Sequence, residues 1–373
     1  MSVVAIAAGG TAGHINPALA LAQELADRGH EIRFYGTGRG MEAQLVPAQG
    51  FAFEGLDVSG FDRSRPWTAV TALVKMRAAR KHLLAEFAVQ GAPAAAVGFG
   101  AYVAFPLADA AAHRGVPLVL HEQNSVPGMA NKALAKRARV LALTYPSSEA
   151  LFAGRTGSTT QVMVCGNPVR RSVLAATRAE GRAALGIPED ATLLLVFGGS
   201  LGAQHLNRCV AQLKERLLQI PNLYVVHAAG ARGYEDAQAA LALTDEEARR
   251  WHLMPYIDDM GSCLAAADLV LSRAGASSVA EIAARCVPSI LVPYPHATAD
   301  HQTTNARFLV DAGGALLVTD ADLDGEAFGQ ELLGLLADPA RRAAMRRSLE
   351  GLGQDQAAVR LADAVEAAMG RAE

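Results

Sequence analysis

His14 is the first residue whose type and surroundings could do chemistry. It follows the glycine-rich stretch GGTAG (residues 9–13), which an apolar run at 3–8 precedes and an apolar-periodic stretch from Pro17 follows. A strand, a glycine turn and a helix start bring backbone N–H groups and the positive end of a helix dipole together, which suits a phosphate. A histidine there could deprotonate a hydroxyl near neutral pH, although a simple polar cap of the turn is the alternative.

A second turn of this kind, GGSLG at 198–202, follows the apolar run at 193–197. Neither turn matches the dinucleotide fingerprint or the P-loop. A nicotinamide dinucleotide would also require an acid at the end of the second strand, where the chain reads Phe34-Tyr35-Gly36-Thr37. We therefore disfavour a dehydrogenase and expect two similar domains facing a cleft, as in enzymes that join a nucleotide-activated donor to an acceptor.

Polar side chains follow other expected strands of the first half. HEQN (His121–Asn124) ends the strand expected at 117–120, and Tyr102 follows the strand expected at 94–97. Functional loops of parallel sheets gather at the carboxyl ends of the strands, so these side chains are candidates for a site with His14. A purely structural hydrogen-bonded cluster is the alternative, because buried polar groups need partners.

Two stretches of the second half suit a nucleoside and a sugar. In RAGASSVAEIAA (273–284), small residues allow close approach to the backbone, and Glu281 could hold both ribose hydroxyls or simply favour the helix dipole. The stretch PYPHATADHQTTNA (293–306) offers polar groups that suit sugar hydroxyls as well as an ordinary solvated loop, namely His296, Asp300, Gln302 and Asn305.

We expect no metal site. The acids of 320–331 match the calcium-loop pattern, but a strand expected at 315–318 precedes them where a helix is needed, and no second copy exists. We interpret them as a turn and N-cap cluster, and reject a manganese site there as well. Zinc-ligand spacing is absent among the four cysteines, Cys165, Cys209, Cys263 and Cys286.

Composition narrows the class of protein. The 373 residues are 51% hydrophobic and 5% aromatic with a net charge of −3, which predicts globular domains and argues against nucleic-acid binding. Unpaired cysteines, the lack of a signal peptide and the lack of about 18 consecutive apolar residues favour the cytoplasm.

Strands and helices alternate along the chain, which predicts an α/β protein with doubly wound parallel sheets. A second cycle begins at Thr192. We expect a Rossmann-like domain at 1–165, joined by a returning helix within 354–373, and a second Rossmann-like domain at 166–353.

The helix expected at 68–87 mixes apolar and basic residues, and residues 1–165 hold 15 Lys and Arg against 11 Asp and Glu. Such faces fit docking on an anionic membrane, whereas core packing with solvated arginines is the more common case.

Eight motifs, in order, resemble the MurG family: GGTAGHINPA, FGAYVAFP, HEQN, GNPVR, GGSLGAQ, YIDDM, AGASSVAEIA and HQTTNA. The resemblance implies a GT-B fold without cofactor or metal, acting at the cytoplasmic membrane face as a peripheral protein. It implies inverting transfer of N-acetylglucosamine from UDP-GlcNAc to undecaprenyl-diphosphate-linked N-acetylmuramoyl-pentapeptide (lipid I to lipid II).

The same resemblance assigns roles to residues. His14 would be the base with Glu122 as its substitute, and Tyr102 and His121 would line the acceptor side. Arg170 and Ser200 would bind the diphosphate, Ile257 the uracil, Glu281 the ribose and Gln302 the sugar. The other donor contacts would be Thr11, Ala12, Gly13, Asn124, Ala276, Ser277, Ser278, Val279 and Ala280.

Two residues depart from the family pattern. Ala12 replaces a glycine, which is harmless only where φ is negative, and Leu201 stands where Gln is frequent. A glycosyltransferase with another acceptor, a UDP-GlcNAc epimerase and a non-catalytic nucleotide-sugar sensor remain alternatives.

Overall fold

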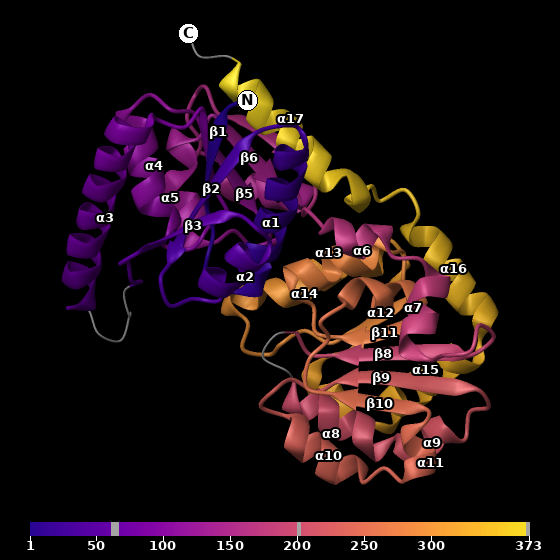
Figure 1. Cartoon of the computed structure of the whole chain (residues 1–373). Helices are drawn as coiled ribbons and strands as arrows, with labels where there is room; N and C mark the ends of the chain where they lie inside the picture. Colours follow the sequence, from indigo (N-terminus) through magenta and orange to yellow (C-terminus); the bar gives the residue numbers. More distant parts are fainter. Residues whose placement is uncertain (61–66, 200–202, 371–373) are drawn as a thin grey trace. The chain divides into compact units, whose positions relative to one another are not determined.

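The computed structural model describes residues 1–60, 67–199 and 203–370. The chain divides into two compact units (Figure 1). Unit 1 comprises Met1–Arg170 and the C-terminal segment from Gln356, and unit 2 comprises Arg171–Asp355. Each unit contains one parallel sheet with helices on both faces, so the prediction of two Rossmann-like α/β domains is confirmed.

Unit 1 is built on a seven-stranded parallel sheet with the order β3-β2-β1-β4-β5-β6-β7. Its central strands are nearly continuous apolar runs because helices cover both of their faces. The strands are β1 (Val3–Ala7), β2 (Glu31–Thr37), β3 (Ala52–Leu56), β4 (Ala95–Gly98), β5 (Leu118–Glu122), β6 (Val140–Leu143) and β7 (Gln161–Val164).

Alternate residues of β1 enter the two cores of unit 1. Val4 and Ile6 pack in one core with residues of α1 and α17, and Ala5 and Ala7 pack in the other with residues of α3 and α4. The α-helices are α1 (Ala12–Asp27), α2 (Glu42–Ala48), α3 (Thr68–Gln90), α4 (Ala104–His113), α5 (Met129–Leu134) and α17 (Ala357–Met369).

Arg28 also ties the C-terminal helix to α1. Its guanidinium bonds Asp363 and Glu366 at 2.7 Å each (Figure 1 shows α17). The final helix therefore belongs to the first core, although it follows unit 2 in sequence.

Unit 2 contains a six-stranded parallel sheet with the order β10-β9-β8-β11-β12-β13. Its strands are β8 (Thr192–Phe197), β9 (Leu223–Ala228), β10 (Trp251–Met254), β11 (Leu269–Ser272), β12 (Ser289–Leu291) and β13 (Ala315–Leu317). Its α-helices are α6 (Arg171–Ala175), α7 (Arg178–Leu185), α8 (Gln204–Gln212), α9 (Lys214–Leu218), α10 (Tyr234–Leu241), α11 (Asp245–Ala248), α12 (Met260–Ala266), α13 (Ala276–Ala284), α14 (His301–Asp311), α15 (Glu326–Ala337) and α16 (Pro339–Leu349).

Among the described residues, no helix has both the length and the apolar character needed to cross a bilayer.

Candidate functional site

The first glycine turn packs against the carboxylate of Glu42, a residue that lies in none of the motifs described above. Glu42, at the start of α2, is fully buried and accepts hydrogen bonds from the backbone N–H of Gly10 (3.3 Å) and Thr37 (2.8 Å) and from the Thr37 hydroxyl (2.6 Å). Gly9 lies against it, since a Cβ there would be 2.6 Å from Oε1. Gly10 has a φ of +91°, which favours glycine. Glu42 therefore fixes the turn that precedes His14.

His14 lies within the first turn of α1, not before it. The helix begins at Ala12 with Thr11 as its extended N-cap residue, so the expected start at Pro17 is wrong. Proline near a helix start removes one backbone hydrogen bond without ending the helix. Nδ1 of His14 lies 3.1 Å from the Thr11 hydroxyl, which orients the half-buried ring.

The two departures from the family pattern have different outcomes. Ala12 is the first helical residue of α1, where φ is negative, so its methyl group causes no backbone strain. Leu201 and Ser200 both lie outside the described residues. Gly13 is the second residue of α1. It was expected to contact the donor together with Thr11 and Ala12.

His121, on β5, is enclosed by unit 1. The side chain has no exposed surface; Nε2 lies 2.9 Å from the carbonyl oxygen of Gly166 and Nδ1 lies 3.0 Å from Nε2 of Gln123. Burial lowers the pKa of His121 to about 4, so the imidazole is neutral at pH 7, with Nε2–H donating to Gly166 and Nδ1 accepting from Gln123. His121 therefore holds the loop in place, and its side chain has no exposed surface with which to contact an acceptor.

The Glu122 side chain is also hydrogen-bonded within the loop that follows β5. Its carboxylate accepts hydrogen bonds from the backbone N–H of Asn124 (3.1 Å) and Gly128 (3.0 Å) and from Nδ2 of Asn131 (2.9 Å). Burial raises the pKa of Glu122, and these hydrogen bonds oppose that shift. Because Gly128 is the N-cap residue of α5, the carboxylate joins the end of β5 to the next helix.

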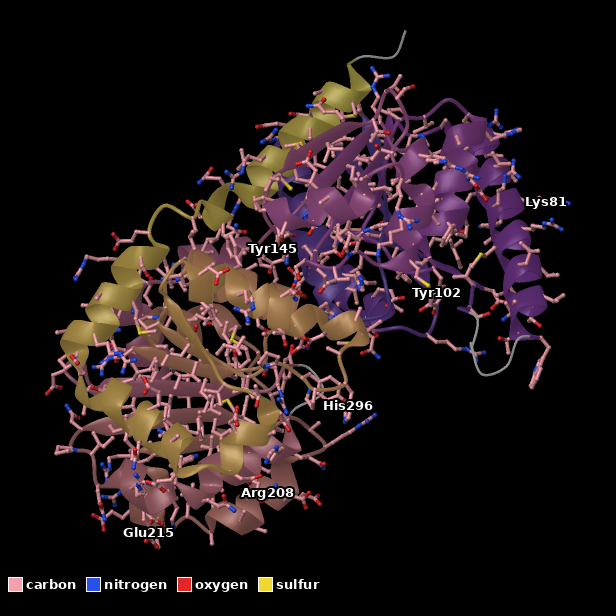
Figure 2. The ribbon with its side chains drawn as sticks, turned by 180° about the vertical axis from the view of Figure 1, so that it is seen from behind. Lys81, Tyr102, Tyr145, Arg208, Glu215 and His296 are labelled. Carbon is pink, nitrogen blue, oxygen red and sulfur yellow. The ribbon has the colours of Figure 1, made fainter. Side chains whose placement is uncertain are left out.

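Asn131 and Gly100 bring this loop next to the glycine turn. A Cβ on Gly100 would lie 3.5 Å from Nδ2 of Asn131 and 3.5 Å from Cδ2 of His14. Tyr102, labelled in Figure 2, is half-buried just after Gly100; burial and the charge of Glu42 raise its pKa. The structure thus gathers His14, Tyr102 and the HEQN loop at the carboxyl ends of β1, β4 and β5.

In unit 2, the start of α13 offers backbone N–H groups. Gly275 is its N-cap residue, Ala276 is its first residue, and Ser277 and Ser278 are partly exposed. Glu281 lies in the second turn and is buried. Val279 and Ala280 are buried. A ligand at the start of this helix would therefore contact chiefly the backbone and hydroxyl groups of Ala276, Ser277 and Ser278.

Gln302, on α14, clamps two strand ends. Its Oε1 accepts hydrogen bonds from the backbone N–H of Ala274 (3.2 Å) after β11 and of Tyr294 (2.9 Å) after β12. Both hydrogen bonds use the amide oxygen, so the N–H groups of Nε2, on the other arm of the planar amide, do not take part in them. Asn305 is buried and donates to the Ala274 carbonyl oxygen at 3.3 Å.

Arg273, which directly follows β11, contacts the end of β12 as well. It donates to the carbonyl oxygens of Val292 (3.3 Å) and Pro293 (3.1 Å) and forms an ion pair with Asp320 at 2.5 Å. The calcium-like acids therefore have protein partners: Asp320 binds Arg273, and Glu331 binds Arg341 at 2.5 Å. The strand predicted before them is β13.

The remaining predicted residues are dispersed. Ile257 is buried in the loop after β10, and the partly buried Arg170 ends the N-terminal segment of unit 1. His296, labelled in Figure 2, and Asp300 are exposed. Asn124 is partly buried, and its carbonyl oxygen accepts from the Ser148 hydroxyl at 3.4 Å.

Comparison with known proteins identifies the family. Residues 4–142 match the glycosyltransferase family 28 N-terminal domain, and residues 193–363 match the C-terminal domain of that family. The chain is 36% identical over 376 residues to the UDP-N-acetylglucosamine--N-acetylmuramyl-(pentapeptide) pyrophosphoryl-undecaprenol N-acetylglucosamine transferase of Desulforudis audaxviator, covering 99% of each chain.

Solved structures agree with this match. The crystal structure of Acinetobacter baumannii MurG has a TM-score of 0.74 and 28% identity, covering 98% of this chain and 99% of that one. The calicheamicin glycosyltransferase CalG4 has a TM-score of 0.66, covering 100% of this chain and 99% of that one, but at 22% identity it shows the fold alone. The chain belongs to the MurG family of N-acetylglucosaminyltransferases, within glycosyltransferase family 28.

Proposed function

We propose that this chain transfers N-acetylglucosamine from UDP-GlcNAc to undecaprenyl-diphosphate-linked N-acetylmuramoyl-pentapeptide, with inversion at the anomeric carbon. The relative from Desulforudis audaxviator is named for this donor sugar and acceptor, and it matches the chain from end to end. The single structural observation that carries the proposal is the Gln302 clamp, because it leaves an amide N–H group beside the start of α13.

Unit 2 is the proposed donor domain. The backbone N–H groups at Ala276–Ser278 suit an anion, Glu281 is placed one helical turn later for the ribose, and Gln302 Nε2 is a donor for a sugar hydroxyl. The Ile257 backbone is assigned to uracil and Arg170 to the diphosphate, together with Ser200, which lies outside the described residues. Thr11, Ala12, Gly13 and Asn124 are assigned to the donor from unit 1.

Unit 1 is the proposed acceptor domain, and His14 is its base. The Thr11 hydroxyl orients the imidazole, and the ring is partly accessible. The carboxylate of Glu122 already accepts three hydrogen bonds, so we assign Glu122 and His121 to positioning the loop and not to proton transfer. Tyr102 would contact the acceptor as a neutral hydroxyl.

The chemistry follows from these roles. The acceptor hydroxyl attacks the anomeric carbon from the face opposite UDP and gives its proton to His14, while the bond from the anomeric carbon to the diphosphate breaks. UDP gains negative charge, which Arg170 and helix N-termini can stabilise. No cofactor enters this scheme.

The decisive experiment measures UDP release from UDP-GlcNAc in EDTA, with and without a short-chain analogue of the lipid-linked acceptor. We expect release only with the acceptor and a β-1,4-linked disaccharide product. Consumption of UDP-GlcNAc without acceptor would instead indicate an epimerase, and donor binding without turnover would indicate a sensor. Activity that returns only with Mg²⁺ or Mn²⁺ would overturn the metal-free leaving-group scheme.

His14→Ala tests the base. We expect kcat to fall by about 10²–10⁴-fold with little change in the KM for UDP-GlcNAc, because the proton is transferred in the chemical step. His113→Ala is the matched control, since His113 is exposed at the end of α4. A His14→Ala enzyme with wild-type kcat would remove His14 from the mechanism.

We also propose that unit 1 docks peripherally on the cytoplasmic membrane through the start of α3. This helix buries Ala72, Ala79, Leu83 and Phe87 in the core. Its N-cap residue and first turns leave large apolar side chains exposed, namely Trp67 (69%), Val70 (68%), Leu73 (49%) and Val74 (61%). Farther along, Lys81 is exposed (Figure 2), so apolar and basic groups lie on one helix as anionic lipid surfaces require.

Vesicle binding tests this surface. Val70→Ser with Val74→Ser should weaken binding to anionic vesicles several-fold, because less apolar area enters the interface. Val89→Ser on the same helix is the control, since Val89 is 87% exposed at the other end. Equal binding by both variants would exclude the start of α3 as the docking surface.

A further inference from the structure

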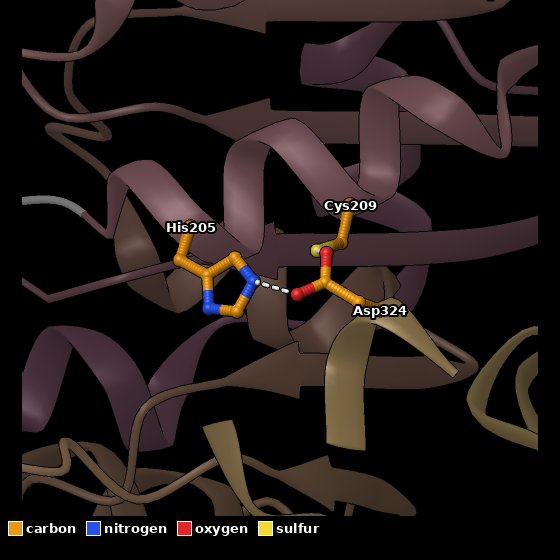
Figure 3. Close-up of side chains that lie close together, drawn as sticks. All are labelled: His205, Cys209 and Asp324. Carbon is orange, nitrogen blue, oxygen red and sulfur yellow. Dashed lines mark hydrogen bonds and ion pairs between the residues drawn. The ribbon is translucent and has the colours of Figure 1, made fainter. Parts of the chain in front are cut away.

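Three potential metal ligands meet in unit 2, among residues that have no role in the proposed transfer. His205 and Cys209 lie one turn apart on α8, and Asp324 approaches them from the short 3-10 helix η4 (Asp320–Asp324; Figure 3). Asp324 Oδ2 lies 3.0 Å from His205 Nε2, and Asp324 Oδ1 lies 3.5 Å from Cys209 Sγ. One ligand atom from each residue lies within 4.8 Å of the other two.

These spacings fit a tetrahedral ion. Zn–N and Zn–O bonds of about 2.0–2.1 Å and Zn–S bonds of about 2.3 Å place neighbouring ligand atoms about 3.3–3.6 Å apart. Asp324 meets His205 and Cys209 near that range through different oxygens, and Arg208 lies 3.8 Å from Oδ1, so side-chain movements would bring one ligand atom from each of the three residues to a common ion. A set of one sulfur, one nitrogen and one oxygen suits zinc better than the hard cations calcium and magnesium.

The surroundings also match those of a zinc-binding histidine. His205 Nδ1 lies 2.7 Å from Asp320 Oδ2, and Asp320 is held in turn by Arg273. A carboxylate that accepts from one ring N–H fixes the tautomer and directs the other nitrogen toward a metal. Cys209 is buried, whereas the Asp324 side chain is 56% exposed, so an ion could enter past Asp324.

We propose that His205 Nε2, Cys209 Sγ and Asp324 bind a zinc ion, with water as the fourth ligand. Binding would replace the contact between His205 and Asp324 with two bonds to zinc, and it would release two protons to solvent: the one that lies between His205 Nε2 and Asp324, and that of the Cys209 thiol. The ion would tie α8 to η4. His205 and Asp324 are 119 positions apart, so no short sequence motif could have indicated the site.

Cobalt titration tests the assignment on the purified full-length protein. We expect a thiolate-to-Co²⁺ charge-transfer band that zinc abolishes by displacing cobalt. The band should be absent in Cys209→Ser and unchanged in Cys263→Ser, whose cysteine is equally buried on α12 of the same unit. Absence of the band in the wild-type chain, or its survival in Cys209→Ser, would overturn the proposal.

A second pair of variants protects the test against misfolding. Asp320→Asn should weaken zinc binding by about 10–100-fold in competition with a chromogenic chelator, as loss of an outer-shell carboxylate does. Asp324→Asn, at an exposed position, should remove a ligand without disturbing the core. Circular dichroism and UDP-GlcNAc affinity report whether each variant is folded. Wild-type zinc affinity in both folded variants would mean that His205 is only an ion-pair partner of the two aspartates.

Discussion

The two units fix the loops at the carboxyl ends of their sheets with different chemical groups. In unit 1, the buried carboxylates of Glu42 and Glu122 accept hydrogen bonds from backbone N–H groups. In unit 2, the neutral amide of Gln302 does this, while Arg273 donates to backbone carbonyl oxygens. A diphosphate near the strand ends of unit 2 would therefore meet an amide and a guanidinium that is ion-paired with Asp320. This difference favours unit 2 as the donor domain.

Removing Glu42 should have the largest effect on stability. Glu42→Ala leaves two backbone N–H groups and a hydroxyl without their acceptor inside unit 1, so we expect a loss on the order of 3–5 kcal/mol in the free energy of unfolding. Urea titration followed by hydrogen exchange in each unit measures it.

Glu42→Gln sharpens this test, because it keeps the shape and one acceptor oxygen but removes the charge. We expect an intermediate loss confined to unit 1. Glu24→Gln is the control, since Glu24 is a partly buried carboxylate of the same unit that pairs with Arg28 on α1 at 2.9 Å. A Glu42→Ala protein as stable as the wild type would show that the carboxylate does not hold the turn.

The sequence predicted the strands well but not which side chains fix the loops at their ends. Buried parallel strands are continuous apolar runs, such as Leu193–Phe197, and are visible without a structure. Glu42 was missed because its partners lie in other elements, Gly10 in the glycine turn and Thr37 at the end of β2. Gln302 was predicted for the sugar, but the direction of its amide depends on strand ends that only the fold brings together.

The sequence also did not show which residues of a helix are exposed or where the first helix begins. The apolar residues of 68–87 look alike in sequence, yet Leu83 and Phe87 enter the core while Val70 and Val74 remain exposed. The start of α1 was misjudged because Pro17 suggests a first helical position, whereas Thr11 is the N-cap residue.

Each unit also buries one neutral histidine on a strand, which predicts a shared sensitivity to acid. Burial lowers the pKa of His121 in unit 1 and of His227 in unit 2 to about 4, from the ordinary histidine value of about 6.5. Above about pH 6.5 the two histidines are neutral in both the folded and the unfolded chain. At lower pH they take up protons in the unfolded chain but not in the folded one. Stability is therefore lost as pH falls toward 4, by about 3 kcal/mol for each histidine.

Hydrogen exchange between pH 7 and 4.5 separates the two contributions. His227→Gln should reduce the acid-linked loss in unit 2 and leave that of unit 1 unchanged. His121→Gln should do the reverse, at a greater cost at pH 7, since both ring nitrogens of His121 are hydrogen-bonded and His227 Nδ1 has no partner among the described residues. An unchanged pH profile in both variants would mean that other groups cause the acid sensitivity.

Gln302→Glu should have the smallest effect and separates clamping from sugar recognition. The glutamate can still accept from Ala274 and Tyr294, so unfolding should be unchanged, but the amide donor is lost. We expect kcat/KM for UDP-GlcNAc to fall about tenfold, the effect of one missing hydrogen bond. Binding of UDP alone is the control for charge: a parallel loss would indicate repulsion of the diphosphate and would argue against Gln302 as the residue that reads the sugar. Gln302→Ala should lower both stability and kcat/KM, because the clamp and the donor disappear together.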